Sequence, residues 1–143
     1  MSIVIEKVEN FDKMSKEDAQ SCIDQVVTLC EENRIHLSKY GNCTGQGTLT
    51  SIQEYETDKR KNRLFSVDDV QRIYSAIPRL VAQRKTINKK TGSYGLKHAF
   101  EKIIGYCTNG ETIMAMILYG FTANFGRDRH VNCCFNFKYL KTT

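Results

Sequence analysis

The chain has 143 residues, of which 41% are hydrophobic and 26% are charged, proportions typical of a soluble globular protein. One domain of this length can bury a substantial core without help from a metal ion or a disulfide. The apolar runs are too short to cross a bilayer and the N-terminus lacks the pattern of a signal peptide. We therefore expect an intracellular protein, in the cytoplasm or nucleus, with no membrane contact.

The formal net charge of +5 is unevenly distributed along the sequence. Residues 1–78 carry 10 Lys and Arg against 13 Asp and Glu, whereas residues 79–143 carry 11 against 3. The first part is therefore acidic and the second strongly basic. This asymmetry indicates a polyanionic partner for the basic part, or an acidic part that covers the basic part within one fold.

The N-terminal part contains one clear helix, over residues 16–32, in which apolar residues recur at helical spacing after the N-cap Ser15. Before it, the imperfect alternation of residues 2–8 predicts a short strand at a sheet edge. After it, three glycines within residues 33–48 predict a loop, and residues 48–55 follow as a short strand.

Three more helices are predicted further along the chain. The first begins after Ser66 and spans residues 67–84, where Pro78 produces either a kink or an end followed by a restart. The second spans residues 94–104 and the third spans residues 110–119, which are almost entirely apolar. A helix without a polar face belongs in the core.

Strict alternation of apolar and polar residues from Val131 to Tyr139 is the strongest strand signal in the sequence. Taken together, the elements predict an α-rich α+β fold, with residues 1–143 forming a single compact domain. This domain would contain about four helices, a C-terminal β-strand and a short N-terminal strand. Its core is expected around Met114, Ile117 and Leu118.

The six cysteines are expected to be reduced thiols, because an intracellular protein of this length needs no disulfides. The nearest approach to a zinc site is the set of Cys107, His130, Cys133 and Cys134. Structural zinc sites usually contain a CxxC pair, which this sequence lacks, and neighbouring residues of a strand point to opposite faces. We therefore predict no metal site and no other cofactor.

A catalytic alternative rests on His98 and Glu101, which lie one turn apart on the predicted helix 94–104. This spacing suits a general base and a carboxylate that orients it, as in a small hydrolase or nuclease. The same spacing is common on any amphipathic helix, and no matching serine or cysteine nucleophile accompanies the pair. A non-enzymatic protein is therefore favoured.

Positive charge is concentrated between residues 79 and 102, where seven Lys and Arg meet one acid, Glu101. A cluster of like charges does not stabilise a folded protein, but it can neutralise the phosphates of a nucleic acid. Lys138 and Lys141 add charge beside the aromatic residues of the last strand. The predicted nucleic-acid-binding residues are Arg79, Arg84, Lys85, Lys89, Lys90, Lys97, Lys102, Arg127 and Arg129.

This binding is expected to involve mainly phosphates and to have low sequence specificity, because the apolar helix 110–119 offers no side chains to base edges. An alternative is a protein that binds a host protein through the acidic helix 16–32 or through the basic residues 84–102. A homodimer, in which two basic arms form a longer binding track, is compatible with the sequence.

Three stretches, KTINKKTGSYGLKH, YCTNGETIMAMILYGF and VNCCFNF, resemble small uncharacterised proteins encoded by phages and large DNA viruses. The resemblance covers roughly residues 78–137 and implies a viral or mobile-element origin. It implies no activity and assigns no role to any residue. The leading prediction is a non-enzymatic viral or mobile-element accessory protein that binds nucleic acid.

Overall fold

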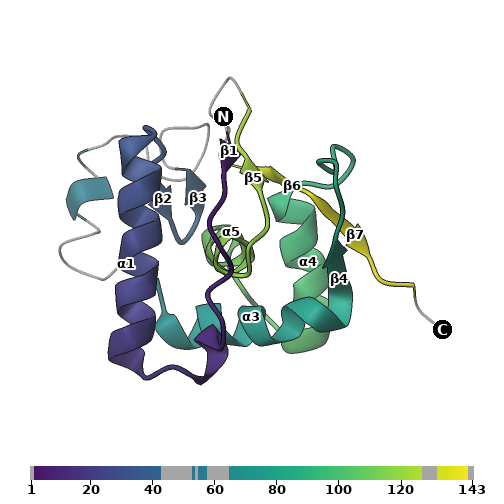
Figure 1. Cartoon of the computed structure of the whole chain (residues 1–143), viewed down its shortest axis with the longest axis horizontal. Helices are drawn as coiled ribbons and strands as arrows, with labels where there is room; N and C mark the ends of the chain where they lie inside the picture. Colours follow the sequence, from purple (N-terminus) through teal and green to yellow (C-terminus); the bar gives the residue numbers. More distant parts are fainter. Residues whose placement is uncertain (1, 43–52, 54, 58–64, 127–131, 142–143) are drawn as a thin grey trace.

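Helix α5 (Asn109–Leu118) runs through the centre of the molecule, and all 10 of its residues are buried. Three other helices pack around it, as Figure 1 shows: α1 (Lys16–Glu32), α3 (Val67–Leu80) and α4 (Ser93–Ile104). A helix that is apolar on nearly every side is stable only when neighbours cover it completely. The expected core position of Met114, Ile117 and Leu118 is confirmed, because each of them is fully buried.

The computed structural model describes residues 2–42, 53, 55–57, 65–126 and 132–141. Over these residues the fold is α-rich α+β, with small antiparallel sheets beside the helices in a single compact domain. The predicted fold class is therefore confirmed.

Three helices begin at serine or threonine N-caps, and the sequence predicts the first two of these caps. The Ser15 hydroxyl accepts a hydrogen bond from the Asp18 N–H, and the Ser66 hydroxyl accepts one from the Asp69 N–H. Thr108 caps α5 in the same way, by accepting from the N–H of Glu111. Each cap satisfies a backbone donor that the first helical turn leaves without a partner. The 17 residues of α1 match the predicted helix 16–32.

The prediction of one helix over residues 67–84 is wrong in its last part. Helix α3 ends at Leu80, and β4 (Val81–Gln83) follows it directly. Pro78 lies in the last turn, where its missing N–H and its ring weaken the helical ladder. Val81 can then leave the helix because β4 pairs antiparallel with β7 (Phe137–Tyr139).

The predicted C-terminal strand is divided into two. Its first part, β6 (Cys134–Phe135), pairs with β5 (Ala123–Asn124). On its other side β5 pairs with β1 (Ser2–Ile3). Strand β1 is shorter than the predicted strand 2–8. Asn136 separates β6 from β7, because its side-chain oxygen accepts the Thr122 N–H at 2.7 Å.

The predicted alternation is correct at Cys133, Phe135 and Phe137, which are all buried. It is wrong at Tyr139, which is 41% exposed. The strand turns outward after Phe137 because β7 pairs with β4 at the surface rather than continuing beside β5.

Two predictions between residues 33 and 57 are wrong within the described residues. The expected loop contains a β-hairpin of β2 (Leu37–Ser38) and β3 (Gly41–Asn42), which packs against α5. The expected strand 48–55 is not seen where the chain is described, since Gln53 and residues 55–57 are helical. Buried contacts that are distant in sequence decide both segments: Tyr55, for example, is fully buried and its hydroxyl donates to Glu31 on α1.

Candidate nucleic-acid interface

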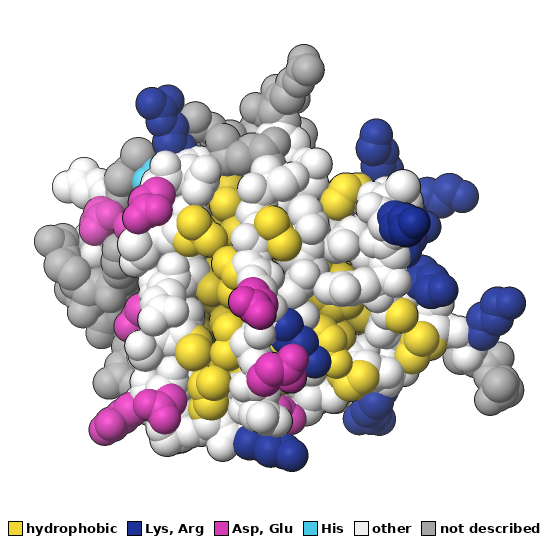
Figure 2. All heavy atoms as spheres, viewed as in Figure 1, with side chains coloured by type: hydrophobic (Ala, Val, Ile, Leu, Met, Phe, Trp, Pro, Cys, Tyr) yellow, Lys and Arg dark blue, Asp and Glu magenta, His cyan; other side chains and the backbone are white. Residues whose placement is uncertain are grey.

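Six exposed basic residues form what we call the basic edge of the molecule. They come from the segment after β4 and from β7 with the residues that follow it: Arg84, Lys85, Lys89, Lys90, Lys138 and Lys141. In Figure 2 the blue side chains gather along the right-hand side, over β4 and β7, while the acidic side chains lie at the left and centre. Charges that are segregated in the sequence are therefore also segregated on this face.

The backbone of the basic edge is fixed rather than a free arm. The Arg84 N–H donates to the Asn136 carbonyl at 2.9 Å, and the Asn88 N–H donates to the Phe135 carbonyl at 2.8 Å. The side chain of Asn88 then accepts the N–H groups of Lys90 and Thr91, which closes a turn between them. The basic side chains thus project from a backbone anchored to the last strands.

No acidic side chain neutralises the basic edge within the described residues. In this part of the chain after Arg79 the carboxylates are those of Glu101 and Glu111. Glu101 is engaged by Lys97 and His98, and Glu111 is buried. The ion pairs of the described residues contain no member of the basic edge. The Arg84 guanidinium donates to the carbonyls of Thr86 and Ile87, so it is less available to a ligand than the lysines of the basic edge.

The other predicted binding residues have different positions. Arg79, in the last turn of α3, and Lys102, in the last turn of α4, are exposed. Lys97 is not on the exposed surface with them: its side chain is only 12% exposed and its ammonium lies 3.1 Å from a Glu101 oxygen. Arg127 and Arg129 lie outside the described residues, as does His130.

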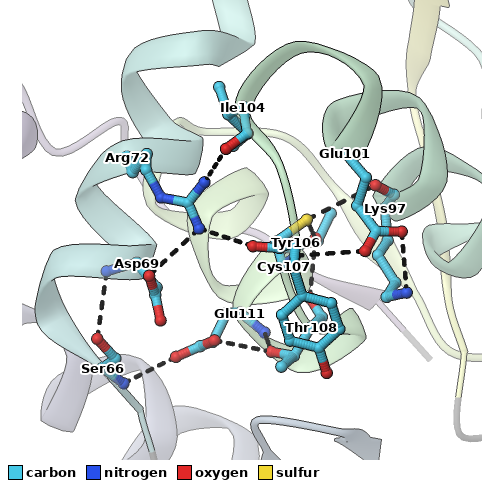
Figure 3. A network of polar contacts seen from close by, with 11 residues as sticks. Ser66, Asp69, Arg72, Lys97, Glu101, Ile104, Tyr106, Cys107, Thr108 and Glu111 are labelled. Atoms are coloured by element: carbon cyan, nitrogen blue, oxygen red, sulfur yellow. Dashed lines mark hydrogen bonds and ion pairs between the residues drawn. The ribbon is translucent and has the colours of Figure 1, made fainter.

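Glu101 joins α4 to the turn that leads into α5 (Figure 3). One carboxylate oxygen is 3.1 Å from the Lys97 ammonium and 2.9 Å from His98 Nδ1, and the other accepts the Cys107 N–H at 3.4 Å. The hydrogen bond from Lys97, helped by the one from Cys107, lowers the pKa of the Glu101 carboxyl. These contacts hold the carboxylate in its charged form and engage both of its oxygens within the fold.

Arg72 and Glu111 complete this network, and the sequence pattern did not single them out. Arg72 on α3 donates to the carbonyls of Ile104 and Tyr106 and pairs with Asp69 at 3.2 Å (Figure 3). A charged residue at the edge of an amphipathic helix is normally solvated, so its role could not be recognised locally. The signal for Glu111 was a carboxylate within an otherwise apolar helix, which needs a buried partner.

The structure brings His98 and Glu101 together but adds no nucleophile beside them among the described residues. Cys107, whose N–H contacts Glu101, is 1% exposed. Burial raises the pKa of its thiol, so the reactive thiolate is disfavoured. Within the described ranges, no group of three or more His, Cys, Asp or Glu residues is placed to hold a metal ion.

Comparisons of the chain with protein-family models, with curated proteins and with solved structures found no match. The resemblance to viral proteins therefore stays a prediction. In the parts of the chain that the structure describes, no helix has the length and apolar character needed to span a membrane.

Proposed function

We propose that this protein is a non-enzymatic accessory protein of a virus or mobile element that binds nucleic acid through phosphates. The basic edge is its contact surface. The observation that carries this proposal is a set of exposed lysines without acidic neighbours among the described residues, on a backbone anchored to β6 and β7. The anchored backbone loses little entropy on binding, and its unneutralised cations gain free energy by releasing counterions from a polyanion.

Low sequence specificity follows from the kinds of side chain that are exposed. Lysine is a point charge that contacts phosphates well and distinguishes bases poorly. The helix that could have entered a groove, α5, is buried along its whole length. Arg84, which could read guanine with a bidentate pair, donates to its own loop instead.

The test is fluorescence anisotropy of labelled DNA and RNA across a salt series. The variant Lys89→Glu with Lys90→Glu should lose most of its affinity at low salt. The matched control is Lys13→Glu with Lys16→Glu, which changes the net charge by the same amount at exposed positions outside the basic edge. Equal loss in both variants would mean that total charge decides binding, and equal retention would refute the basic edge as the site.

A second candidate function is binding of a host protein, and one observation favours it. An open groove lies beside β4, with apolar lining residues that include Ile5, Pro78, Val81, Tyr119, Phe121 and Leu140, and with Glu6, Lys7 and Gln83 among its polar ones. Such a groove suits apolar side chains of a peptide rather than phosphates. A partner held there would stay bound at high salt and would be released by Leu140→Asp, at a lining residue that is 41% exposed. Binding of nucleic acid would instead be weakened by salt and unaffected by Leu140→Asp.

A further inference from the structure

Tyr94 and Tyr106 are the two most exposed aromatic residues that the structure describes, at 52% and 73% exposure. Tyr94 lies in the first turn of α4, and Tyr106 lies in the turn between α4 and α5. A large ring in water contributes little to the stability of a fold. Two such rings at one place form an apolar surface next to an otherwise charged region.

Both rings face the same lysine. The Lys97 ammonium lies 5.2 Å from the centroid of the Tyr94 ring and 5.7 Å from that of Tyr106. These are cation–π distances, and the ammonium is also bound to Glu101. Because its charge is already neutralised and its side chain is mostly buried, Lys97 is better suited to orient the two rings than to bind a phosphate.

Further contacts hold each tyrosine before any ligand arrives. The Tyr94 ring meets His98 edge to face, with centroids 4.5 Å apart and an interplanar angle of 87°. The backbone of Tyr106 is held by Arg72, which donates to its carbonyl at 2.8 Å, while the Tyr106 ring stays outside the network (Figure 3). A platform ordered in this way loses less entropy when it binds.

We infer that Tyr94 and Tyr106 stack on the bases of a single-stranded nucleic acid whose phosphates contact the basic edge. This inference rests on the proposed function and makes it more specific. The two centroids are at most about 11 Å apart, because both lie near one ammonium group, and stacked rings are separated by roughly 3.5 Å. Neighbouring bases of one short strand can therefore reach both rings. The faces of paired bases are covered in a duplex, so the platform selects unpaired bases.

The route of the strand follows α4. Lys89 and Lys90 lie just before this helix, Tyr94 is in its first turn, and Lys102 is in its last. The 12 residues of α4 extend over about 18 Å. Cations at both ends with aromatic rings between them match the alternation of phosphates and bases along a short single strand.

The experiment compares a single strand, its duplex, and an abasic strand of equal length, with wild-type protein and four variants. Tyr106→Leu and Tyr94→Leu remove the ring, Tyr106→Phe keeps it, and Tyr40→Leu removes an exposed ring outside this platform. Each Leu variant at the platform should weaken binding of the single strand roughly 10-fold, and should leave binding of the duplex and the abasic strand unchanged. Tyr106→Phe and Tyr40→Leu should behave as wild type.

A base analogue supplies a direct signal for stacking. The fluorescence of 2-aminopurine within the strand should be quenched by wild-type protein and by Tyr106→Phe, but not by the variant with both platform tyrosines changed to Leu. Single-strand binding that is unaffected in that double variant, or equal affinity for the abasic strand, would overturn the inference while the proposed function stands. Failure of wild-type protein to bind any of the three probes at low salt would overturn both.

Discussion

The Glu111 carboxylate accepts the Ser66 backbone N–H at 2.8 Å, and so the first turn of α5 supports the residue that caps α3. Its other oxygen accepts the Thr108 hydroxyl at 2.9 Å. Glu111 is only 2% exposed, and its hydrogen bond with Ser66 joins two segments that are 45 residues apart in the chain. A buried carboxylate with these roles should affect stability both through its contacts and through its charge.

We expect Glu111→Ala to destabilise the protein by about 2–3 kcal/mol, because it removes the acceptor of the Ser66 N–H and leaves a cavity where a buried side chain stood. Glu111→Gln keeps an acceptor and the volume, so it should cost much less near neutral pH. Urea unfolding of the two variants measures the difference. Equal destabilisation by Ala and Gln would show that the charge itself is required.

The pH dependence of these variants has a defined sign. Burial raises the pKa of Glu111 above its ordinary value of 4.5, so the folded state holds this proton more tightly than the unfolded state does. The contribution of Glu111 is therefore largest below pH 4.5 and is lost as the pH rises through the folded-state pKa. Relative to wild type, Glu111→Gln should gain stability as the pH rises from 4.5 towards neutrality. A constant difference across that range would contradict the raised pKa.

Arg72→Leu should destabilise the protein by about 1–3 kcal/mol, because the carbonyls of Ile104 and Tyr106 lose a charged donor. The matched control is Arg79→Leu on the same helix, whose side chain is exposed and should matter little. Thermal unfolding gives the stability of each variant. The same shift for both would mean that the loss of an arginine, and not these contacts, is responsible.

Gly110→Ala should be among the most damaging single substitutions. A Cβ atom at Gly110 would lie 1.7 Å from the Ser38 carbonyl oxygen, and the Gly110 N–H already donates to the Lys39 carbonyl at 2.7 Å. The backbone of the hairpin would have to move away from α5, at a cost of about 3 kcal/mol or more. Gly105→Ala is the comparison: the added Cβ has open space, but φ is +84° and ψ is −169°, so its cost of about 1–3 kcal/mol comes from the backbone alone.

Thiol labelling should distinguish the cysteines by burial. Cys30, Cys107 and Cys133 are buried, and burial raises the pKa of each thiol, to about 12 for Cys30. They should resist iodoacetamide in the folded protein and react after denaturation. Cys134 is half-buried and should be labelled faster than these three. Labelling sites can be identified by mass spectrometry, and rapid native labelling of Cys133 would contradict its burial.

Local sequence signals predicted where the helices begin, whereas the end of α3 is set by contacts with residues distant in the sequence. Ser15, Ser66 and Thr108 cap their helices through hydrogen bonds to residues three positions away, which a sequence pattern contains. The end of α3 depends on β7, because Val81 pairs with Tyr139. A helical pattern that continues past residue 80 carries no information about that strand.

The sequence predicted the concentration of positive charge at the candidate site, but not which of its residues are anchored, buried or exposed. The sequence identifies Lys89 and Lys90 as basic residues without acidic neighbours. Their anchoring to the last strands depends on the backbone hydrogen bond from Asn88 to Phe135, which no local pattern indicates. The burial of Lys97 and the exposure of Tyr106 likewise depend on how the turn after α4 is tied to α3 by Arg72.

The separation of acidic and basic side chains in Figure 2 has a consequence for the protein in solution without any ligand. On this face opposite charges lie apart, so the acidic surface around α1 on one copy attracts the basic edge of another. Contacts of this head-to-tail kind do not close into a ring unless the rotation permits it, and they propagate into open chains. We expect turbidity to increase on dialysis below about 20 mM salt and to clear when salt restores screening. Added polyanion should dissolve the same aggregates, since it competes for the lysines.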